Sequence, residues 1–372
     1  AEKDPFATEL AKVALWIHCV VPDQPLTFLD HHIVCGDSLV GWPLLDVPNS
    51  IPDDAFQVSG SKGSEAAGLT RARRRNEQFT SSGGDLFQQG TVAFSLKLPP
   101  ELKVPDRTPA DVHTKAIAYQ DWINSSEYSH WKRAADIWTA AFFWTTSQSN
   151  VAAPTSIEYA EALDGKADPL LAESAASLLA DINPLHWPLA FPEAHAAGGF
   201  DLVLGNPPWE QFESGEEPFF KQHRPAIAAM NSETRKKAIA NLETEERALF
   251  SRWQLYRSLQ GRLAHYAKSC GRFTRTSGKV NTYVLFVELA ANSSRRAGLI
   301  VKSGIAIDAS QSRVWRKLLD GRRVREVIDM VNQELSGKRV FPAVAAVERF
   351  SILSLGERSD VDIESSMLNF GV

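Results

Sequence analysis

Residues 5–20 carry an apolar stripe at three- and four-residue spacing, which is the repeat of one face of a helix. A Pro-rich stretch follows, and residues 31–35 then form a short β-prone run that ends at Gly36-Asp37. This order predicts a helix and then a strand with a carboxylate at its C-terminal end.

Residues 42–198 have a different character. Pro, Gly, Ser and Asp are frequent over 46–68 and 80–113, whereas 114–145 is rich in Trp and Tyr and 156–181 is rich in Ala and Leu with a helical pattern. We therefore expect a mostly helical insertion here.

The clearest signal of a buried strand is Phe-Asp-Leu-Val-Leu-Gly at residues 200–205. It runs directly into Asn206-Pro207-Pro208-Trp209. Two consecutive prolines cannot continue a strand or the interior of a helix, so the chain must turn at this strand's C-terminal end.

The remaining pattern alternates helices with strands. It predicts a charged helical insertion at about 213–275, helices over 280–291 and 314–319, and strands over 297–301, 324–331 and 349–355. Such alternation indicates an α/β doubly wound sheet. The last two strands lack a helix between them, so we expect them to pair antiparallel.

Bulk composition narrows the classes of protein. The chain has 372 residues, 44% hydrophobic and 23% charged, with a net charge of −5, which is ordinary globular composition. A DNA-binding protein of this charge must concentrate Lys and Arg on one face. No apolar stretch could span a membrane, the three cysteines lack metal-ligand spacing and no signal peptide is visible, so we expect a cytoplasmic protein without a metal site.

The turn at 206–209 suggests a specific chemistry. Ligands of open α/β sheets lie beyond the carboxyl ends of the strands. There the Asn206 amide oxygen and the Pro207 carbonyl, held by the stiff prolines, could accept both N–H groups of an exocyclic amino group, and Trp209 could stack on a planar base. The alternative is a purely structural turn.

Residues 199–210 resemble motif IV of amino-methylating DNA methyltransferases, and the wider chain resembles their γ class of adenine-N6 enzymes. It is similar to the large methyltransferases of single-chain restriction–modification enzymes and of phage-exclusion systems. The resemblance implies a Rossmann-like fold, the cofactor S-adenosylmethionine, double-stranded DNA with a flipped-out adenine, and Asn206, Pro207, Pro208 and Trp209 as catalytic residues. Other restriction or defence components are possible partners.

Two acidic residues match the cofactor motifs of that family. Glu2, in the opening Ala-Glu-Lys-Asp-Pro, is similar to the motif II residue that holds the ribose hydroxyls. Asp37 is similar to the motif III residue that accepts a hydrogen bond from the adenine amino group of the cofactor. Without the resemblance, a solvated Glu and a turn Asp would be the simpler interpretations.

Later segments resemble motifs V, VI and VIII. Residues 280–288 and 297–305 match a pocket-lining helix and the fifth strand, although Lys302 stands where the family often has Pro. Residues 337–342 and 347–350 match the last motif, in which Phe341 would pack against the extruded base. A core Phe in a hairpin loop is the alternative.

A Gly-rich motif I, which the family places before motif II, is not found. We therefore interpret the chain as a fragment whose sheet is incomplete at its N-terminal strands, with core at 1–41 and 199–372 and the insertion at 42–198. On its own it is expected to be inactive and to bind S-adenosylmethionine weakly or not at all.

Three other functions stay open. A protein glutamine N5-methyltransferase uses a similar turn but is a smaller protein, and cytosine-N4 enzymes usually have Ser in place of Asn206. A non-catalytic DNA-binding scaffold of the same fold is the third. The basic run at 71–75 could contact phosphates or be a solvated loop.

Overall fold

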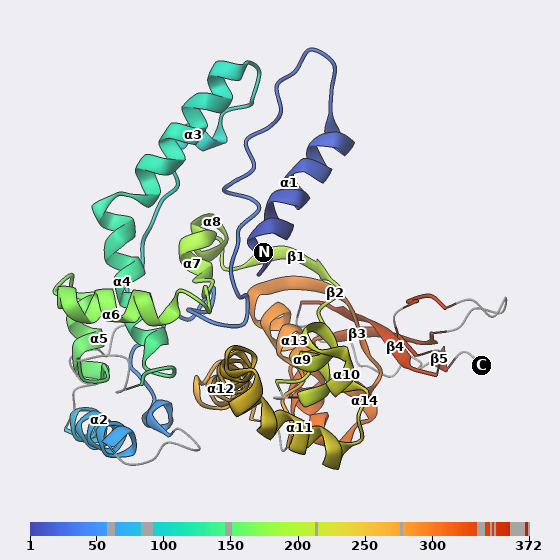
Figure 1. Ribbon diagram of the computed structural model, residues 1–372. Coiled ribbons are helices and arrows are strands. Elements are labelled where there is room, and N and C mark those ends of the chain that lie inside the picture. Colours follow the sequence, from blue (N-terminus) through green and yellow to red (C-terminus); the bar gives the residue numbers. More distant parts are fainter. Residues whose placement is uncertain are drawn as a thin grey trace.

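The computed structural model describes residues 1–57, 64–82, 92–145, 151–212, 215–275, 278–332, 339–342, 344–345, 347–357 and 369–370. Helices and strands alternate along the C-terminal half, whereas the rest is mostly helical (Figure 1). The helices are α1 Pro5–Cys19, α2 Ser64–Ser81, α3 Pro109–Ile123, α4 Ser126–Ala140, α5 Ser156–Leu163, α6 Pro169–Leu179, α7 Trp187–Ala190, α8 Pro192–Ala196, α9 Glu216–His223, α10 Pro225–Ala228, α11 Ser232–Glu245, α12 Arg247–Ser269, α13 Thr282–Ser293, α14 Gly304–Ile307 and α15 Ser312–Asp320. The strands are β1 Phe200–Gly205, β2 Ser294–Lys302, β3 Val324–Val331, β4 Arg349–Leu355 and β5 Asn369–Phe370.

The strands form one mixed sheet in the order β1-β2-β4-β3-β5. β1 and β2 pair parallel, and β4 pairs antiparallel with both β2 and β3. The predicted antiparallel pairing of the last two long strands is therefore confirmed. Because β4 reverses the direction twice, β1, β2 and β3 all point the same way, and their carboxyl ends lie at one edge of the sheet.

The two faces of the sheet differ. On one face, Leu299 and Leu353 are buried in a core with Val284 of α13 and Val314 of α15. On the opposite face, side chains such as Leu204 remain exposed among the described residues. A doubly wound sheet has helices covering both of its faces. That the second face is covered in this way therefore stays a prediction.

β1 corrects one expectation. Its bounds are as predicted, but its burial is not: Leu202 and Leu204 are 54% and 73% exposed. The apolar pattern indicates a strand whose faces are covered, whereas β1 lies at an edge of the sheet and pairs, within the described residues, only with β2. Its other edge is unpaired there.

The N-terminal segment forms the predicted helix but not the predicted strand. α1 spans Pro5–Cys19, with Asp4 as its N-cap. Residues 31–35 are turns and bends, and only Cys35 makes a parallel bridge, to Glu2. The Glu2 N–H donates to the Val34 carbonyl and the Gly36 N–H to the Glu2 carbonyl, at 3.0 and 2.8 Å. A strand needs a ladder of several such bridges to a partner strand, and this segment has only one. The interpretation of 31–35 as a strand is therefore wrong.

The helical part has its own core, in which Trp42, Trp138 and Phe142 are almost wholly buried. Tyr266 of α12 belongs to this core, and its hydroxyl donates to the Gly41 carbonyl at 3.1 Å. The C-terminal end of α12 thus joins the first predicted insertion in one core, whereas Phe219 and Trp253 of the second insertion belong to a separate core. In Figure 1, α3 extends to the top and α2 lies at the lower left.

The basic run at 71–75 lies within α2 and is not a loop. The Pro, Gly and Ser residues on either side of this run led to the wrong expectation of a loop. Arg73 pairs with Glu77 at 2.8 Å and Arg75 with Glu158 at 2.5 Å.

Candidate active site

The Asn-Pro-Pro-Trp turn leaves the sheet at the carboxyl end of β1. Ser303 and Asn332 directly follow β2 and β3, so these two polar residues lie along the same edge as Asn206. This edge is where ligands of open α/β sheets bind. The structure therefore places the predicted catalytic turn at the edge that the sequence indicated.

A buried threonine holds the turn. The Thr282 hydroxyl, at the start of α13, lies 2.7 Å from the Pro208 carbonyl and 2.9 Å from the Glu210 carbonyl, and the Glu210 N–H donates to it at 3.2 Å. The Thr282 N–H also donates to the Glu210 carbonyl at 2.9 Å. A proline turn cannot be fixed by its own N–H groups, so these bonds from α13 define its position.

The hydrogen bonds from Thr282 do not involve the two acceptors that the sequence analysis singled out. Within the described residues, neither the Asn206 side chain nor the Pro207 carbonyl takes part in a hydrogen bond. Asn206 is exposed and the Pro207 ring is buried. Within the described residues, no other group of the protein therefore occupies these two oxygen acceptors.

Trp209 is half-buried and anchored. Its indole N–H donates to the Ile300 carbonyl of β2 at 3.2 Å. The ring stacks on Phe350 with centroids 6.1 Å apart and meets Phe341 edge to face at 5.5 Å. The rings of Trp209 and Phe341 contact each other, so a base could pack against both but not between them in this arrangement.

Hydrogen bonds between β2, β3 and β4 stiffen the sheet beside this aromatic group. The Ser351 hydroxyl donates to Asp329 at 3.2 Å and to Ser303 at 3.0 Å, and Ser303 and Arg349 also donate to Asp329. Burial acts to raise the pKa of Asp329, but the hydrogen bond from Ser303 and the charge of Arg349 lower it on balance. The carboxylate therefore stays ionised and joins three strands.

The predicted cofactor residues lie together at the N-terminal segment. Glu2 is exposed, and its Oε1 accepts from the backbone N–H groups of Lys3 and Asp4 at 2.7 and 3.1 Å. Asp37 is buried; its Oδ1 accepts from the Leu39 N–H at 3.0 Å and its Oδ2 from the Lys3 ammonium at 2.8 Å. The bridge between Glu2 and Cys35 brings the two carboxylates to the same end of the paired backbone.

The structure thus gathers the predicted residues into two groups. Trp209 and Phe341 touch beside Asn206, and Glu2 and Asp37 share the second group. Among the described residues, no hydrogen bond or ring contact joins the groups. Residues 337 and 338 of the last predicted motif lie outside the described part.

Sequence reasoning assigned no role to three residues that organise these groups: Thr282, Asn332 and Lys3. Asn332 was detectable as a polar residue directly after a strand, and Thr282 as a hydroxyl side chain at a helix start. Lys3 follows Glu2 directly, but its pairing with Asp37 depends on the fold.

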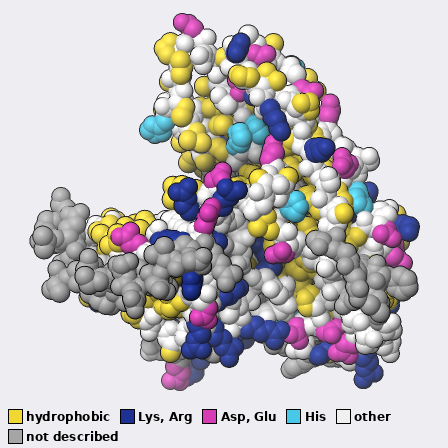
Figure 2. Space-filling view, turned by 180° about the vertical axis from the view of Figure 1, so that it is seen from behind, with side chains coloured by type: hydrophobic (Ala, Val, Ile, Leu, Met, Phe, Trp, Pro, Cys, Tyr) yellow, Lys and Arg dark blue, Asp and Glu magenta, His cyan; other side chains and the backbone are white. Residues whose placement is uncertain are grey.

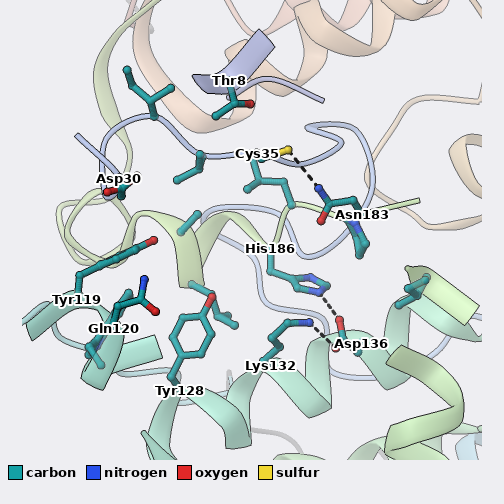
Figure 3. A pocket seen from close by; sticks show the side chains of 18 of the residues that line it. Thr8, Asp30, Cys35, Tyr119, Gln120, Tyr128, Lys132, Asp136, Asn183 and His186 are labelled. Atoms are coloured by element: carbon teal, nitrogen blue, oxygen red, sulfur yellow. Dashed lines mark hydrogen bonds and ion pairs between the residues drawn. The ribbon is translucent and has the colours of Figure 1, made fainter. Parts of the chain in front are cut away.

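A cavity of about 380 Å³ lies elsewhere, between α1, the segment 30–35, α3, α4 and the segment 183–190. Figure 3 shows Tyr119 and Tyr128 among the lining side chains, together with a chain of interactions from Lys132 through Asp136 to His186. The His186 ring lies 2.9 Å from Asp136, and burial lowers the pKa of His186. None of the predicted site residues lines this cavity.

Figure 2 shows Lys and Arg side chains gathered mainly over the lower part of the rear face, with Asp and Glu interspersed. No helix in the described part is long and apolar enough to cross a membrane. Nor do three or more His, Cys, Asp or Glu side chains come together there as a potential metal site.

Comparison with known proteins supplies the family. Residues 1–238 match the model of the Eco57I restriction-modification methylase family. The chain belongs to this family. No curated protein and no solved structure matched it.

Membership supports a DNA methyltransferase of a restriction–modification system, which acts on DNA. The mixed sheet with many helices is consistent with a methyltransferase-like fold. The matched segment contains the turn at 206–209 as well as Glu2 and Asp37.

Proposed function

We propose that the protein transfers a methyl group from S-adenosylmethionine to N6 of an adenine flipped out of double-stranded DNA, in restriction–modification or phage defence. The observation that carries this proposal is the pair of unused acceptors at Asn206 and Pro207 beside the Trp209 ring. An exocyclic amino group offers two N–H donors, which matches these two oxygens.

The residues of the turn would then have distinct roles. The Asn206 amide oxygen and the Pro207 carbonyl would accept the two N–H groups and stabilise the positive charge that the nitrogen gains as it is methylated. Trp209 would offer the base the face that Phe350 does not cover, and Phe341 would pack against the edge of the base. Unstacking the adenine costs a few kcal/mol, which such stacking offsets.

The cofactor residues fit S-adenosylmethionine in their donor and acceptor chemistry. The second oxygen of the exposed Glu2 carboxylate is available for ribose hydroxyls, and Asp37 can accept from an adenine amino group where Lys3 now binds. When bound, the cofactor supplies an electrophilic methyl group. Glu2 and Asp37 would hold it through its ribose and adenine.

Product analysis tests the proposal. Full-length protein is incubated with methyl-labelled S-adenosylmethionine and duplex DNA, and the DNA is digested to nucleosides. Label in N6-methyldeoxyadenosine is expected, with kcat reduced about 100-fold by Asn206→Ala, because one preformed acceptor is lost. Asn241→Ala, an exposed Asn in α11, is the matched control and should leave kcat unchanged.

Other outcomes would overturn the proposal. Label in N4-methylcytosine would assign the other base, and label in protein glutamine would assign a different substrate class. DNA binding without transfer, unaffected by Asn206→Ala, would indicate the non-catalytic scaffold.

A further inference from the structure

The segment that carries Phe341 depends on one side chain. Asn332, directly after β3, is 0% exposed, and its amide group donates to the carbonyls of Phe341, Val344 and Ala345 at 3.0, 3.0 and 3.2 Å. Its amide oxygen accepts from the Phe341 N–H at 2.7 Å. Four hydrogen bonds thus join this one side chain to the backbone between Phe341 and Ala345.

The described part of 339–348 forms neither helix nor strand, so it has no regular ladder to satisfy its backbone. Backbone groups buried without a partner cost free energy comparable to a lost hydrogen bond. A primary amide suits the role of Asn332 because it donates and accepts at once, which a carboxylate or an alkyl group cannot do. The loop conformation therefore depends on Asn332.

The Asn332 backbone is fixed in turn by the sheet. Its N–H donates to the Glu348 carbonyl at 3.0 Å, just before β4 begins. Phe341 contacts Phe350 of β4 at 5.1 Å and Trp209 at 5.5 Å, so the loop rests on the same aromatic group as the turn. Rigid β3 is thereby connected to Phe341 through the Asn332 amide.

We propose that Asn332 is a positioning residue that holds Phe341 against Trp209 and so sets the space left for the target base. The effect of Asn332 on the space for the target base rests on the proposed function. The contact between Phe341 and Trp209 does not. Loss of the amide would release Phe341 from Trp209 without removing any group that would touch the base.

The chain offers a matched control for this proposal. Asn76 in α2 is also 0% exposed, and its amide group donates to the Ile51 carbonyl and accepts from the Ser156 N–H, at 2.8 and 2.7 Å. It lies in the helical core and has no contact with Trp209. Asn332→Ala and Asn76→Ala should both lower the melting temperature, since each leaves buried backbone groups without partners.

The first measurement does not depend on activity. Full-length protein labelled with fluorotryptophan gives a fluorine resonance for Trp209, identified as the signal missing in Trp209→Phe. Asn332→Ala and Phe341→Ala should each shift or broaden this resonance, and Asn76→Ala should not. An unchanged Trp209 resonance in Asn332→Ala would overturn the proposal.

The second measurement is a double-mutant cycle on methyl transfer. Asn332→Ala should lower kcat/KM for DNA about 10-fold, a typical effect of a displaced binding group, and leave the Kd of S-adenosylmethionine unchanged. In the Phe341→Ala background it should cause no further loss. Additive losses would show that Asn332 acts by another route. If no variant or parent transfers methyl groups, the proposed function fails, and the fluorine measurement still decides the contact.

Discussion

The Asn-Pro-Pro-Trp turn at residues 206–209 and the Glu2–Asp37 group are held by different forces. The bonds made directly to the turn and to Phe341 are neutral, from the Thr282 hydroxyl, the Ile300 carbonyl and the Asn332 amide, whereas the charged Asp329–Arg349 pair acts within the sheet. At the N-terminal segment Asp37 is held by the Lys3 ammonium, and a histidine pair lies nearby in sequence. Neutral hydrogen bonds change little with pH or salt, whereas charged pairs are screened and titrate.

The two groups also differ in the backbone structure that holds them. The turn is anchored by a sheet and by α13, while Glu2 and Asp37 depend on isolated bridges to Cys35 and Pro184. We therefore expect geometry to dominate the effect of changes at the first site. In the Glu2–Asp37 group, we expect charge to dominate the effect of substitutions.

Apart from the loss of Asn206 itself, the largest expected effect comes from removing the Thr282 hydroxyl. Thr282→Val keeps the shape of the side chain but removes its bonds to Pro208 and Glu210, and should lower kcat about 10- to 100-fold, because small displacements of reacting groups are costly. Thr282→Ser keeps the hydroxyl and should stay within about 3-fold of the parent. Steady-state kinetics of methyl transfer test this pair, and equal losses in both variants would contradict this role of the hydroxyl.

A smaller effect is expected at the charged group. In the full-length protein, Asp37→Ala should weaken the binding of S-adenosylmethionine about 10-fold, measured as a calorimetric Kd, since a charge-assisted hydrogen bond is lost. Lys3→Gln should change Kd only at low ionic strength, because its pairing with Asp37 is part-exposed and screened by salt. Asp46→Ala, an exposed carboxylate, serves as the control. If Lys3→Gln changed the Kd equally at low and high ionic strength, the contrast between a neutral and a charged group would be wrong.

The smallest effect concerns pH. Burial lowers the pKa of His31 from 6.5 to about 4, with the neighbouring charge of His32 acting in the same direction. Between these values the unfolded chain binds a proton that the folded protein does not, so stability is present near pH 7 and is lost as pH falls toward 4. The melting temperature should therefore fall by a few degrees over this window.

His31→Gln should flatten this dependence, and His18→Gln, at an exposed position of α1, should not. Although burial acts to raise it, the hydrogen bond from Ser303 and the charge of Arg349 lower the pKa of Asp329 from its ordinary value, so the sheet should lose this contribution only in stronger acid. Thermal melts of the three proteins from pH 7 to 4.5 test the difference, and identical profiles would contradict the role of His31.

Most of the sheet could be predicted from local pattern. Residues 324–331 and 349–355 alternate and contain many β-branched or apolar side chains, and both form strands with the predicted bounds and antiparallel pairing. By contrast, 31–35 has the composition of a strand but pairs only at Cys35, since hydrogen-bond partners decide whether a β-prone run becomes a strand. α2 was missed because the Pro-, Gly- and Ser-rich flanks outweighed its own pattern.

The sequence alone determined the turn at 206–209, since two prolines after an apolar run permit nothing else, and it indicated the acceptors and the aromatic ring through residue chemistry. Only the tertiary structure decided what holds them. Thr282 is 76 residues from Asn206 along the chain and Phe341 lies further still. Such contacts arise from strand order and helix packing, which local pattern does not encode.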